Sequence, residues 1–295
     1  MNIAKTGMFS IVGRPNVGKS SLLNALAGQK IAIVSDKPQT TRNRICGIVN
    51  REDKQYIFMD TPGFHKPRTR LGDFMVSVVE ESVNDTDTVI LVVEPQPHGK
   101  QEEILIENIK ASGVGSILVI NKIDTIEKEK LLEVIADYST MHEFDAVIPV
   151  SAKQGDGLEI LIEELDSQLV EGCALYPEDM ISDQPEKVIV AEYIREKALR
   201  LLDREIPHGI AVEIEKFEER DNGTIEIGAV IYCEKDSHKG IIIGKQGAML
   251  KKIGSYARAD IEKFMGTKVF LTLWVKVKEG WRDNRYLMRN FGYDT

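Results

Sequence analysis

The sequence has little of what would place it in a membrane or outside the cell. It has no run of eighteen apolar residues, so no membrane-spanning helix is predicted. Its N-terminus has no long apolar segment followed by a small-residue cleavage site, so no signal peptide is expected. Its three cysteines, Cys46, Cys173 and Cys233, are too few and too scattered for a disulfide framework or a zinc site. These absences predict a protein of a reducing compartment, the cytoplasm.

The 295 residues suit two domains better than one, and their charge is unevenly divided. The whole chain has a net charge of −9, yet the stretch from Lys235 to Thr295 has 13 basic and 6 acidic side chains. An acidic body with a basic C-terminal end is typical of a protein that meets a polyanion there. On charge alone, a solvated lysine-rich face is an equally good interpretation.

Short apolar runs alternate with helical patterns in the first half of the chain. The runs lie at 8–12, 56–59, 89–93, 117–120 and 147–150, and the helical patterns at 19–26, 102–111, 128–138 and 158–170. This alternation predicts an α/β domain with a mostly parallel sheet, covered on both faces by helices. We assign residues 1–171 to it. Ligands of such sheets bind at the carboxyl ends of the strands.

A polar segment with two prolines and no periodicity comes next and predicts a linker at 172–187. The pattern then changes to that of a smaller α+β domain, which we assign to residues 188–295. Its expected elements are a helix at 191–202, strands at 210–217 and 224–233, a helix ending near Phe264, and a strand at 269–277.

The clearest motif follows the first predicted strand and opens the first predicted helix. It fits the phosphate-loop pattern G-x-x-x-x-G-K-S/T with Gly13, Arg14, Pro15, Asn16, Val17, Gly18, Lys19 and Ser20, followed by Ser21. Glycines let backbone N–H groups turn inward around phosphate, and the start of the helix adds its dipole. Lys19 is expected to reach the β- and γ-phosphates, and the Ser20 hydroxyl to bind Mg²⁺. The loop alone does not distinguish GTP from ATP.

Two further strand ends complete a guanine-binding pattern. Asn121, Lys122 and Asp124 follow the run at 117–120, and Ser151, Ala152 and Lys153 follow the run at 147–150. A buried Asp124 carboxylate would accept hydrogen bonds from the ring N–H and the amine of guanine, a donor pair that adenine lacks. Lys122 is expected to cover the base plane, Asn121 to tie loops together, and the Ser151–Lys153 loop to place an N–H at the guanine carbonyl.

The remaining nucleotide ligands are predicted from position along the chain. Asp60 ends the run at 56–59 and is expected to hold Mg²⁺, in part through water. Gly63 has no side chain, so its N–H can approach the γ-phosphate. We expect Thr41 to join the metal shell, with Thr40 as the alternative. Lys19, Thr41 and Gly63 are therefore the predicted catalytic residues.

One position departs from the pattern of Ras-like enzymes, which place a glutamine after Asp-x-x-Gly to orient the attacking water. Here that residue is Phe64, followed by His65, and a lone loop histidine is more often solvated than catalytic. We therefore expect slow hydrolysis by the isolated chain, driven by positioning and by the charge of Mg²⁺. An extra cation could take the place of an arginine finger.

The basic end contains a G-x-x-G loop after an isoleucine run. The expected RNA-binding residues are Ile243, Gly244, Lys245, Gln246, Gly247, Lys251 and Lys252. In this order of elements the loop matches the layout of a KH domain, in which the nucleic-acid backbone passes close to the loop. The tail interleaves basic and aromatic residues, and Trp281 and Arg282 are candidates for stacking on bases. Packing of this tail on its own domain is the competing interpretation.

With these motifs in place, the chain resembles the Era family of bacterial GTPases over nearly its whole length. The nucleotide motifs and the Gln39–Arg42 segment are shared by many GTPases. The junction at 177–186, the Ile194-Arg195-Glu196-Lys197 sequence and the G-x-x-G end point to Era. The resemblance implies an α/β P-loop GTPase domain with a mostly parallel sheet and a smaller α+β type II KH domain. It also implies GTP and GDP as ligands, with Mg²⁺.

Several functional details come from the resemblance alone. It implies a monomeric factor of small (30S) ribosomal subunit assembly that binds 16S rRNA near its 3′ end, with peripheral contact to the inner face of the cell membrane. Related GTPases bind K⁺ through an asparagine that matches Asn16. Two alternatives remain open: a membrane-associated cell-cycle or signalling GTPase whose basic end meets anionic lipid, and a ribosome-binding module whose nucleotide is only structural.

Overall fold

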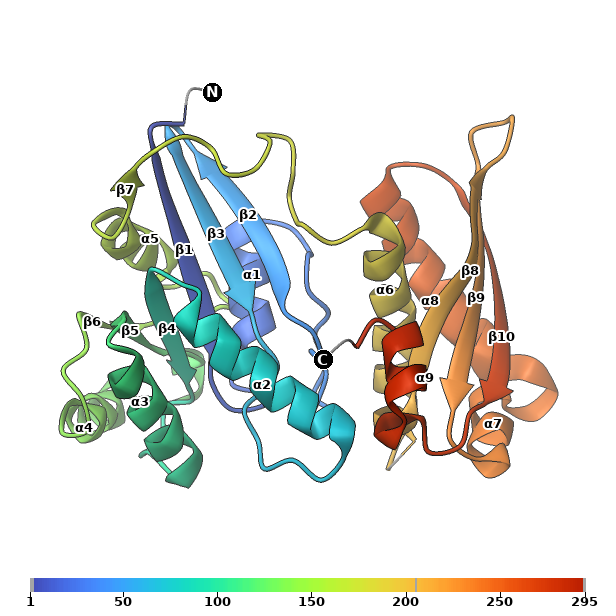
Figure 1. Ribbon diagram of the computed structural model, residues 1–295, viewed down its shortest axis with the longest axis horizontal. Coiled ribbons are helices and arrows are strands. Elements are labelled where there is room, and N and C mark those ends of the chain that lie inside the picture. Colours follow the sequence, from blue (N-terminus) through green and yellow to red (C-terminus); the bar gives the residue numbers. More distant parts are fainter. Residues whose placement is uncertain (1–2, 205, 294–295) are drawn as a thin grey trace. The chain divides into compact units, whose positions relative to one another are not determined.

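A seven-stranded sheet forms the centre of the N-terminal part of the protein (Figure 1). The structure is a computed structural model that describes residues 3–204 and 206–293. The outer ends of the predicted domain ranges, residues 1 and 295, therefore lie outside the described residues. The spatial order of the main strands is β2-β3-β1-β4-β5-β6, and β7 pairs with β1. The strands are β1 (Lys5–Val12), β2 (Ile45–Arg51), β3 (Lys54–Asp60), β4 (Thr88–Val93), β5 (Gly115–Ile120), β6 (Ala146–Pro149) and β7 (Val170–Glu171).

This sheet is mostly parallel and buried on both faces, because alternate residues of each strand enter two different apolar clusters. On β4, Ile90 packs with the cluster that contains helices α1 and α5, whereas Leu91 packs with the cluster that contains α2, α3 and α4. The strands are accordingly continuous apolar runs rather than alternating ones, as expected of a doubly covered sheet. The helices are α1 (Lys19–Ala27), α2 (Arg70–Asn84), α3 (Lys100–Ser112), α4 (Lys128–Ser139) and α5 (Leu158–Asp166).

The edge strand β2 was not predicted. It pairs antiparallel with β3 through a two-residue turn in which Glu52 takes the left-handed conformation, with φ of 53°. The predicted linker then lies along the free edge of β2, where the Ile48 N–H donates to Ile181 O at 2.9 Å and Gly47 pairs with Ser182. The linker is thus an extended segment that is hydrogen-bonded to the sheet.

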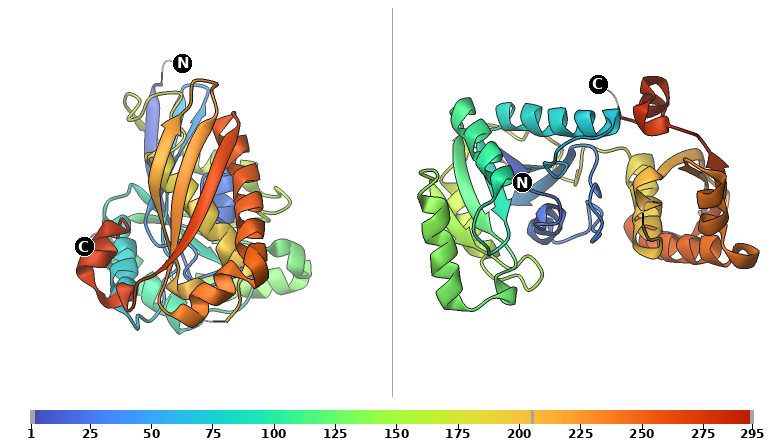
Figure 2. Two further views of the ribbon diagram at one scale, coloured as in Figure 1. Left: turned by 90° about the vertical axis from the view of Figure 1, so that its right-hand side faces the viewer. Right: turned by 90° about the horizontal axis from the view of Figure 1, so that it is seen from below.

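A three-stranded sheet with the order β10-β9-β8 organises the C-terminal part (Figure 2, left). Strand β10 runs parallel to β9, and β8 runs antiparallel to it. Odd-numbered residues of β9, such as Ile227 and Ile231, pack with α6 and α8 in one apolar cluster. The elements are α6 (Glu186–Leu201), β8 (Ala211–Glu219), β9 (Ile225–Cys233), α7 (Asp236–Ile243), α8 (Ala248–Met265), β10 (Val269–Val277) and α9 (Arg285–Asn290).

The chain forms two compact units, and neither is continuous in sequence. The first contains the chain up to Ala32, Thr41–Pro67 and Met75–Asp183. The second contains Ile33–Thr40, Arg68–Phe74 and the chain from Gln184 onward. Two short segments inside the predicted first domain therefore belong to the second unit.

Candidate nucleotide site and RNA-binding surface

The phosphate loop joins the carboxyl end of β1 to α1, and its glycines are required by close packing. Gly13 has φ of 154°, and a Cβ atom there would lie 2.3 Å from Val92 O. Gly18 has φ of 102°, and a Cβ atom there would lie 2.2 Å from the Asn121 side chain. Any other residue would push the loop off β4 and β5, so the two glycines set the loop conformation.

Lys19 curls back over this loop. Its Nζ donates to Gly13 O at 3.0 Å and to Arg14 O at 2.9 Å, and the residue is buried. Burial lowers the pKa of the Lys19 ammonium to about 8, although Asp60 opposes this shift. A buried cation with carbonyl oxygens as its hydrogen-bond acceptors is well placed to receive an anion such as phosphate.

Three oxygen-bearing side chains converge beside Lys19. Ser20 Oγ donates to Asp60 Oδ2 at 2.6 Å and lies 2.9 Å from Thr41 Oγ1. The second oxygen, Asp60 Oδ1, is buried and has no hydrogen-bond partner among the described residues. Burial raises the pKa of the Asp60 carboxyl to about 6, against the effects of Lys19 and of hydrogen bonds from Ser20 and Thr41. One carboxylate and two hydroxyls form the all-oxygen donor set that Mg²⁺ prefers, so these residues fit that ion.

The structure separates the two candidate threonines. The Thr40 hydroxyl donates to the backbone carbonyl of Lys37 at 2.6 Å. The Thr41 hydroxyl instead points to Ser20. Geometry therefore favours Thr41 as the metal-facing residue of the pair.

The Asp-Thr-Pro-Gly segment packs directly on the phosphate loop. A Cβ atom on Gly63 would lie 2.6 Å from the Pro15 Cα, and the Phe64 N–H donates to Gly13 O at 3.0 Å. Phe64 is buried in an apolar cluster, and His65 Nδ1 lies 2.9 Å from Gly63 O. The Phe64 side chain has no polar group that could orient water at the loop.

The two guanine-reading loops are tied to the phosphate loop by hydrogen bonds. Asn121 donates from Nδ2 to Val17 O at 2.9 Å and accepts the Ala152 N–H at 3.0 Å. Lys122 Nζ donates to Asn16 O at 2.6 Å. The ends of β1, β5 and β6 thus form one polar corner, as predicted from their positions at strand ends.

Asp124 lies in this corner, but one expectation about it is wrong. Ser151 Oγ donates to Asp124 Oδ1 at 2.7 Å, which orients the carboxylate. The residue is exposed rather than buried, because it lies in a one-turn 3₁₀ helix (Ile123–Thr125) at the rim of the sheet. A base bound at Asp124 would therefore be selected by hydrogen-bond geometry more than by burial of the free carboxylate.

Sequence reasoning missed two acidic residues of the site. Glu94, directly after β4, lies 2.5 Å from Lys122 Nζ and 3.7 Å from Arg14 Nη2. Arg14 also pairs with the buried Glu102 of α3. Arg14 is therefore paired with two carboxylates, Glu94 and Glu102. The position of Glu94 at a strand end was the signal that could have identified it.

In the second unit, the predicted G-x-x-G loop joins two helices, α7 and α8. Gly244 has φ of 72°, and a Cβ atom there would lie 2.7 Å from the Met249 Cβ. Gln246 also has positive φ, 52°, and both Lys245 and Gln246 are exposed. The isoleucine run is the end of α7, with Ile242 buried and Ile243 partly buried.

A cavity of about 440 Å³ extends from this loop between α8 and β10. Its floor includes Leu250, Leu271 and Leu273, and its basic side chains are Lys251 and Arg258. Lys252 points elsewhere, with its Nζ 5.8 Å from the centre of the Tyr256 ring. An apolar floor beside exposed cations suits a single-stranded nucleic acid, whose bases and phosphates need both.

The structure contradicts the stacking role predicted for the tail. Trp281 is fully buried, its Nε1–H donates to Gly209 O at 2.9 Å, and its ring packs on Tyr293. Arg282 donates to Glu234 at 2.6 Å. The tail packs on its own unit, as the competing interpretation held, because the indole supplies apolar area and satisfies its N–H internally. No helix within residues 3–204 and 206–293 is both long and apolar enough to cross a membrane.

Two family models match the chain in the same order as the two sites. Residues 8–122 match the model for 50S ribosome-binding GTPases, and residues 205–282 match the model for KH domains. These matches agree with the predicted fold class.

Curated relatives match over nearly the full length. The chain is 52% identical over 293 residues to GTPase Era of Ruminiclostridium cellulolyticum, covering 99% of this chain and 98% of that one. It is 50% identical over 291 residues to GTPase Era of Caldanaerobacter subterraneus, covering 98% of each chain.

Two solved structures are similar at a TM-score of 0.95 and 39% identity, each covering 99% of this chain and 100% of the other. One is Era in complex with MgGDPNP and nucleotides 1506–1542 of 16S ribosomal RNA. The other is an Era variant of Aquifex aeolicus bound to GDP and AlF₄⁻.

Proposed function

The chain belongs to the Era family of GTPases, and from this premise we propose that it is a GTP-driven switch that binds 16S rRNA near its 3′ end and assists assembly of the small (30S) ribosomal subunit. One observation carries the proposal. A single chain combines an oxygen-lined corner beside Lys19 with a G-x-x-G groove flanked by lysines. The similar structure of Era with MgGDPNP and 16S rRNA supports both halves.

In the first unit, we assign the phosphates to the loop Gly13–Ser21 and to Lys19. Backbone N–H groups at the start of α1 would face the phosphates, and Lys19 would exchange its carbonyl partners for phosphate oxygens. Ser20, Thr41 and Asp60 are the residues that would hold Mg²⁺. When bound, Mg²⁺ offsets the negative charge of the phosphate oxygens.

The base is assigned to Asp124, with the residues that orient it. Ser151 orients the carboxylate, Lys122 lies along the loop where the base plane would be, and the loop Ser151-Ala152-Lys153 would place a backbone N–H at the guanine carbonyl. Asn121 holds these loops to the phosphate loop. GTP and GDP share this base, so the difference between the two states lies at Thr41 and Gly63.

Hydrolysis by the isolated chain is proposed to be slow. Lys19, Thr41 and Gly63 position phosphate and metal, while the buried Phe64 leaves the attacking water without a side chain to orient it. Asn16 is the proposed residue for a K⁺ ion that would supply the charge of an arginine finger. Rates measured in sodium and in potassium salts test this part, and equal rates would remove the potassium assignment.

The RNA site is assigned to the G-x-x-G loop and the groove beside it. Lys245 and Lys251 face the sugar–phosphate backbone, and Ile243 and Leu250 give apolar contact to bases. Arg258 is added to the predicted set because it lines the groove. Trp281 is removed because it is buried.

The alternative is a membrane-associated signalling GTPase whose basic end meets anionic lipid. A lipid patch needs positive charge but no structured glycine loop, whereas a side chain at Gly244 would collide with Met249. Binding to phosphatidylserine vesicles that equalled binding to an rRNA 3′ oligonucleotide would favour this alternative.

We propose a monomeric cytoplasmic protein with domains at 1–171 and 188–295 joined by a linker at 172–187.

The most informative experiment is crosslinking in cells, followed by sequencing of the bound RNA. The proposal expects reads concentrated at the 3′ end of 16S rRNA, and dispersed reads would contradict it. A structural role for the nucleotide is tested separately with Thr41→Ala or a non-hydrolysable GTP analogue. Unchanged RNA affinity in both would favour that structural role.

A further inference from the structure

The segment Ile33–Thr40 directly precedes Thr41, yet it belongs to the second compact unit. Ile33 is 1% exposed and packs in the same apolar cluster as Val190 and Tyr193 of α6. Just before it, the Asn24 side chain of α1 accepts the N–H groups of Ile31 and Ala32 at 2.8 and 2.9 Å. The backbone segment that precedes Thr41 is therefore held in place rather than free.

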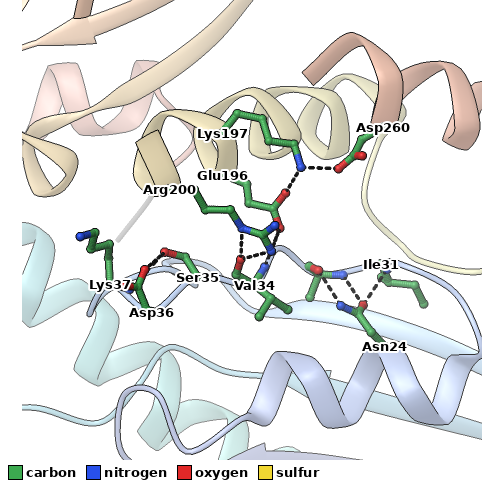
Figure 3. A network of polar contacts seen from close by, with 11 residues as sticks. Asn24, Ile31, Val34, Ser35, Asp36, Lys37, Glu196, Lys197, Arg200 and Asp260 are labelled. Atoms are coloured by element: carbon green, nitrogen blue, oxygen red, sulfur yellow. Dashed lines mark hydrogen bonds and ion pairs between the residues drawn. The ribbon is translucent and has the colours of Figure 1, made fainter. Parts of the chain in front are cut away.

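A charged pair on α6 binds both backbone polar groups of Val34 (Figure 3). Glu196 is 0% exposed and accepts the Val34 N–H at 3.0 Å. Arg200 donates from Nε and Nη2 to Val34 O at 2.9 and 2.6 Å, and it pairs with Glu196 at 3.0 Å. Charged groups with backbone partners make stronger hydrogen bonds than neutral ones, so this contact fixes one residue of the segment closely.

Arg195, the neighbouring residue on α6, binds the other end of the segment. It is 1% exposed, pairs with Glu192, and donates to the carbonyl oxygen of Thr40. That carbonyl belongs to the peptide bond that joins Thr40 to Thr41. The last backbone group before the predicted metal-binding hydroxyl is therefore held by a buried guanidinium.

The same cluster reaches the helix that follows the G-x-x-G loop. Lys197 donates to Glu196 at 2.6 Å and to Asp260 of α8 at 2.5 Å, as Figure 3 shows. A buried carboxylate is unfavourable unless several partners compensate it, and here Val34, Lys197 and Arg200 do so. Because one of these partners is the segment itself, release of the segment would leave Glu196 less well compensated.

Thr41, the next residue along the chain after this segment, faces the metal corner of the first unit. In the same structure Thr41 Oγ1 lies 2.9 Å from Ser20 Oγ. The sequence Ile194-Arg195-Glu196-Lys197 was singled out above only as a family signature. Its side chains turn out to hold the backbone that precedes Thr41.

We propose that Arg195, Glu196 and Arg200 are positioning residues for Thr41. By fixing Val34 and Thr40 they keep the Thr41 hydroxyl at Ser20 and Asp60, and they thereby favour Mg²⁺-GTP over GDP. The inference rests on the proposed function in one respect, that Thr41 binds the metal only with GTP. Because the coupling between two binding sites is reciprocal, a ligand that binds α8 and stabilises this cluster also favours the GTP-bound state.

The first test is hydrogen exchange in the full-length, nucleotide-free protein. Glu196→Ala should speed amide exchange within 33–40 by about tenfold or more, because the Val34 N–H loses its acceptor. Arg200→Met is a milder variant, since its side chain is 48% exposed, and it should act in the same direction. Glu234→Gln, which disturbs a different carboxylate–arginine pair of the second unit, is the control and should leave 33–40 unchanged.

The second test is the ratio of affinities for a non-hydrolysable GTP analogue and GDP. With Mg²⁺ present, Arg200→Met should weaken analogue binding by about five- to tenfold, within the usual range of coupling between sites, and leave GDP binding unchanged. In a Thr41→Ala background Arg200→Met should have no further effect, because the group that it positions is gone.

Three results would overturn the proposal: unchanged exchange in 33–40, faster exchange with an unchanged GTP-to-GDP ratio, or a full effect of Arg200→Met in the Thr41→Ala background. Failure of the premise is recognised separately. If Thr41→Ala itself leaves the GTP-to-GDP ratio unchanged, the assigned metal role of Thr41 is wrong, whatever the exchange data show.

Discussion

The two units present their functional groups in opposite ways. In the nucleotide corner, the functional groups are held by hydrogen bonds: Ser20 donates to Asp60, and Lys19 donates to carbonyl oxygens of the phosphate loop. In the RNA-binding surface, Lys245 and Gln246 are exposed and the glycine backbone provides the shape. A site that stabilises developing charge needs preorganised groups, whereas a surface that follows a nucleic-acid backbone gains from access and from mobile cations. Substitutions should therefore act differently in the two regions.

The largest effect is expected at the base-reading carboxylate. Asp124→Asn replaces an acceptor of two N–H groups by an amide and should weaken GTP and GDP binding by about 10³-fold, somewhat less than for a buried acceptor. Titration with fluorescent guanine nucleotides measures this loss. RNA binding without nucleotide should be unchanged, and a parallel loss there would mean that the two regions are not separable.

A smaller loss, about 100-fold, is expected from Lys245→Asp combined with Gln246→Asp. Both side chains are exposed, so the change should reverse charge at the phosphate contacts without unfolding the loop. Binding of an rRNA 3′ oligonucleotide at several salt concentrations measures both the affinity and its salt slope. Lys268→Asp, at an exposed lysine outside the groove, is the control. GTP hydrolysis should persist in the double variant, and its loss would contradict the division between the regions.

The preorganised corner should have a cost in stability that depends on pH. The Asp60 pKa is raised to about 6, so the folded chain binds a proton more tightly than the unfolded chain. The contribution of the Asp60 carboxyl to the free energy of unfolding is therefore present below about pH 4 and is lost as the pH rises through 6. Without nucleotide or Mg²⁺, Asp60→Asn should make the chain more stable by about 2–3 kcal/mol at pH 7 than the parent.

Urea unfolding at pH 4.5 and pH 7 measures the stability effect of Asp60→Asn. The gain of the variant over the parent should shrink at the lower pH. A gain that is equal at both pH values would show that the carboxylate is not the titrating group.

The smallest effect is expected at Glu94, which supports the corner from outside it. Glu94→Gln weakens the pair with Lys122 and should raise the dissociation constants of GTP and GDP together by about tenfold. Glu94→Asp should restore part of the loss. Glu103→Gln, at an exposed carboxylate of α3 that lies 3.8 Å from His98, is the matched control. A change in the hydrolysis rate with unchanged affinity would show that Glu94 acts on the reaction instead.

Most of the nucleotide corner could be predicted because its residues lie at strand ends that the apolar runs identify. Gly13, Asp60 and Asn121 each follow such a run. Edge strand β2 was missed because Gly47 and Asn50 interrupt its short apolar pattern. Glu94 lies at a strand end but belongs to no motif, and Glu102 has no sequence signal, so only the fold brings it to Arg14.

The second unit was harder to predict from the sequence, for two physical reasons. Trp281 could either stack on RNA or fill a core, and only the position of Gly209 O decides that its N–H is satisfied internally. The contact of Val34 with Glu196 joins residues 162 positions apart, and a local sequence pattern cannot predict a contact across that separation. Charge asymmetry predicted a basic end but could not place Lys251 in the groove and Lys252 outside it.

The linker that lies on β2 should affect how truncated fragments of the protein behave. Strand β2 is an outer strand, and the N–H of Ile48 and the carbonyl of Cys46 are occupied by Ile181 and Ser182. An open strand edge invites pairing between molecules. A fragment that stopped at Glu171 would keep every nucleotide motif but uncover this edge, and it should self-associate at high concentration. A fragment that continues to Asp183 keeps the edge capped and should stay dispersed.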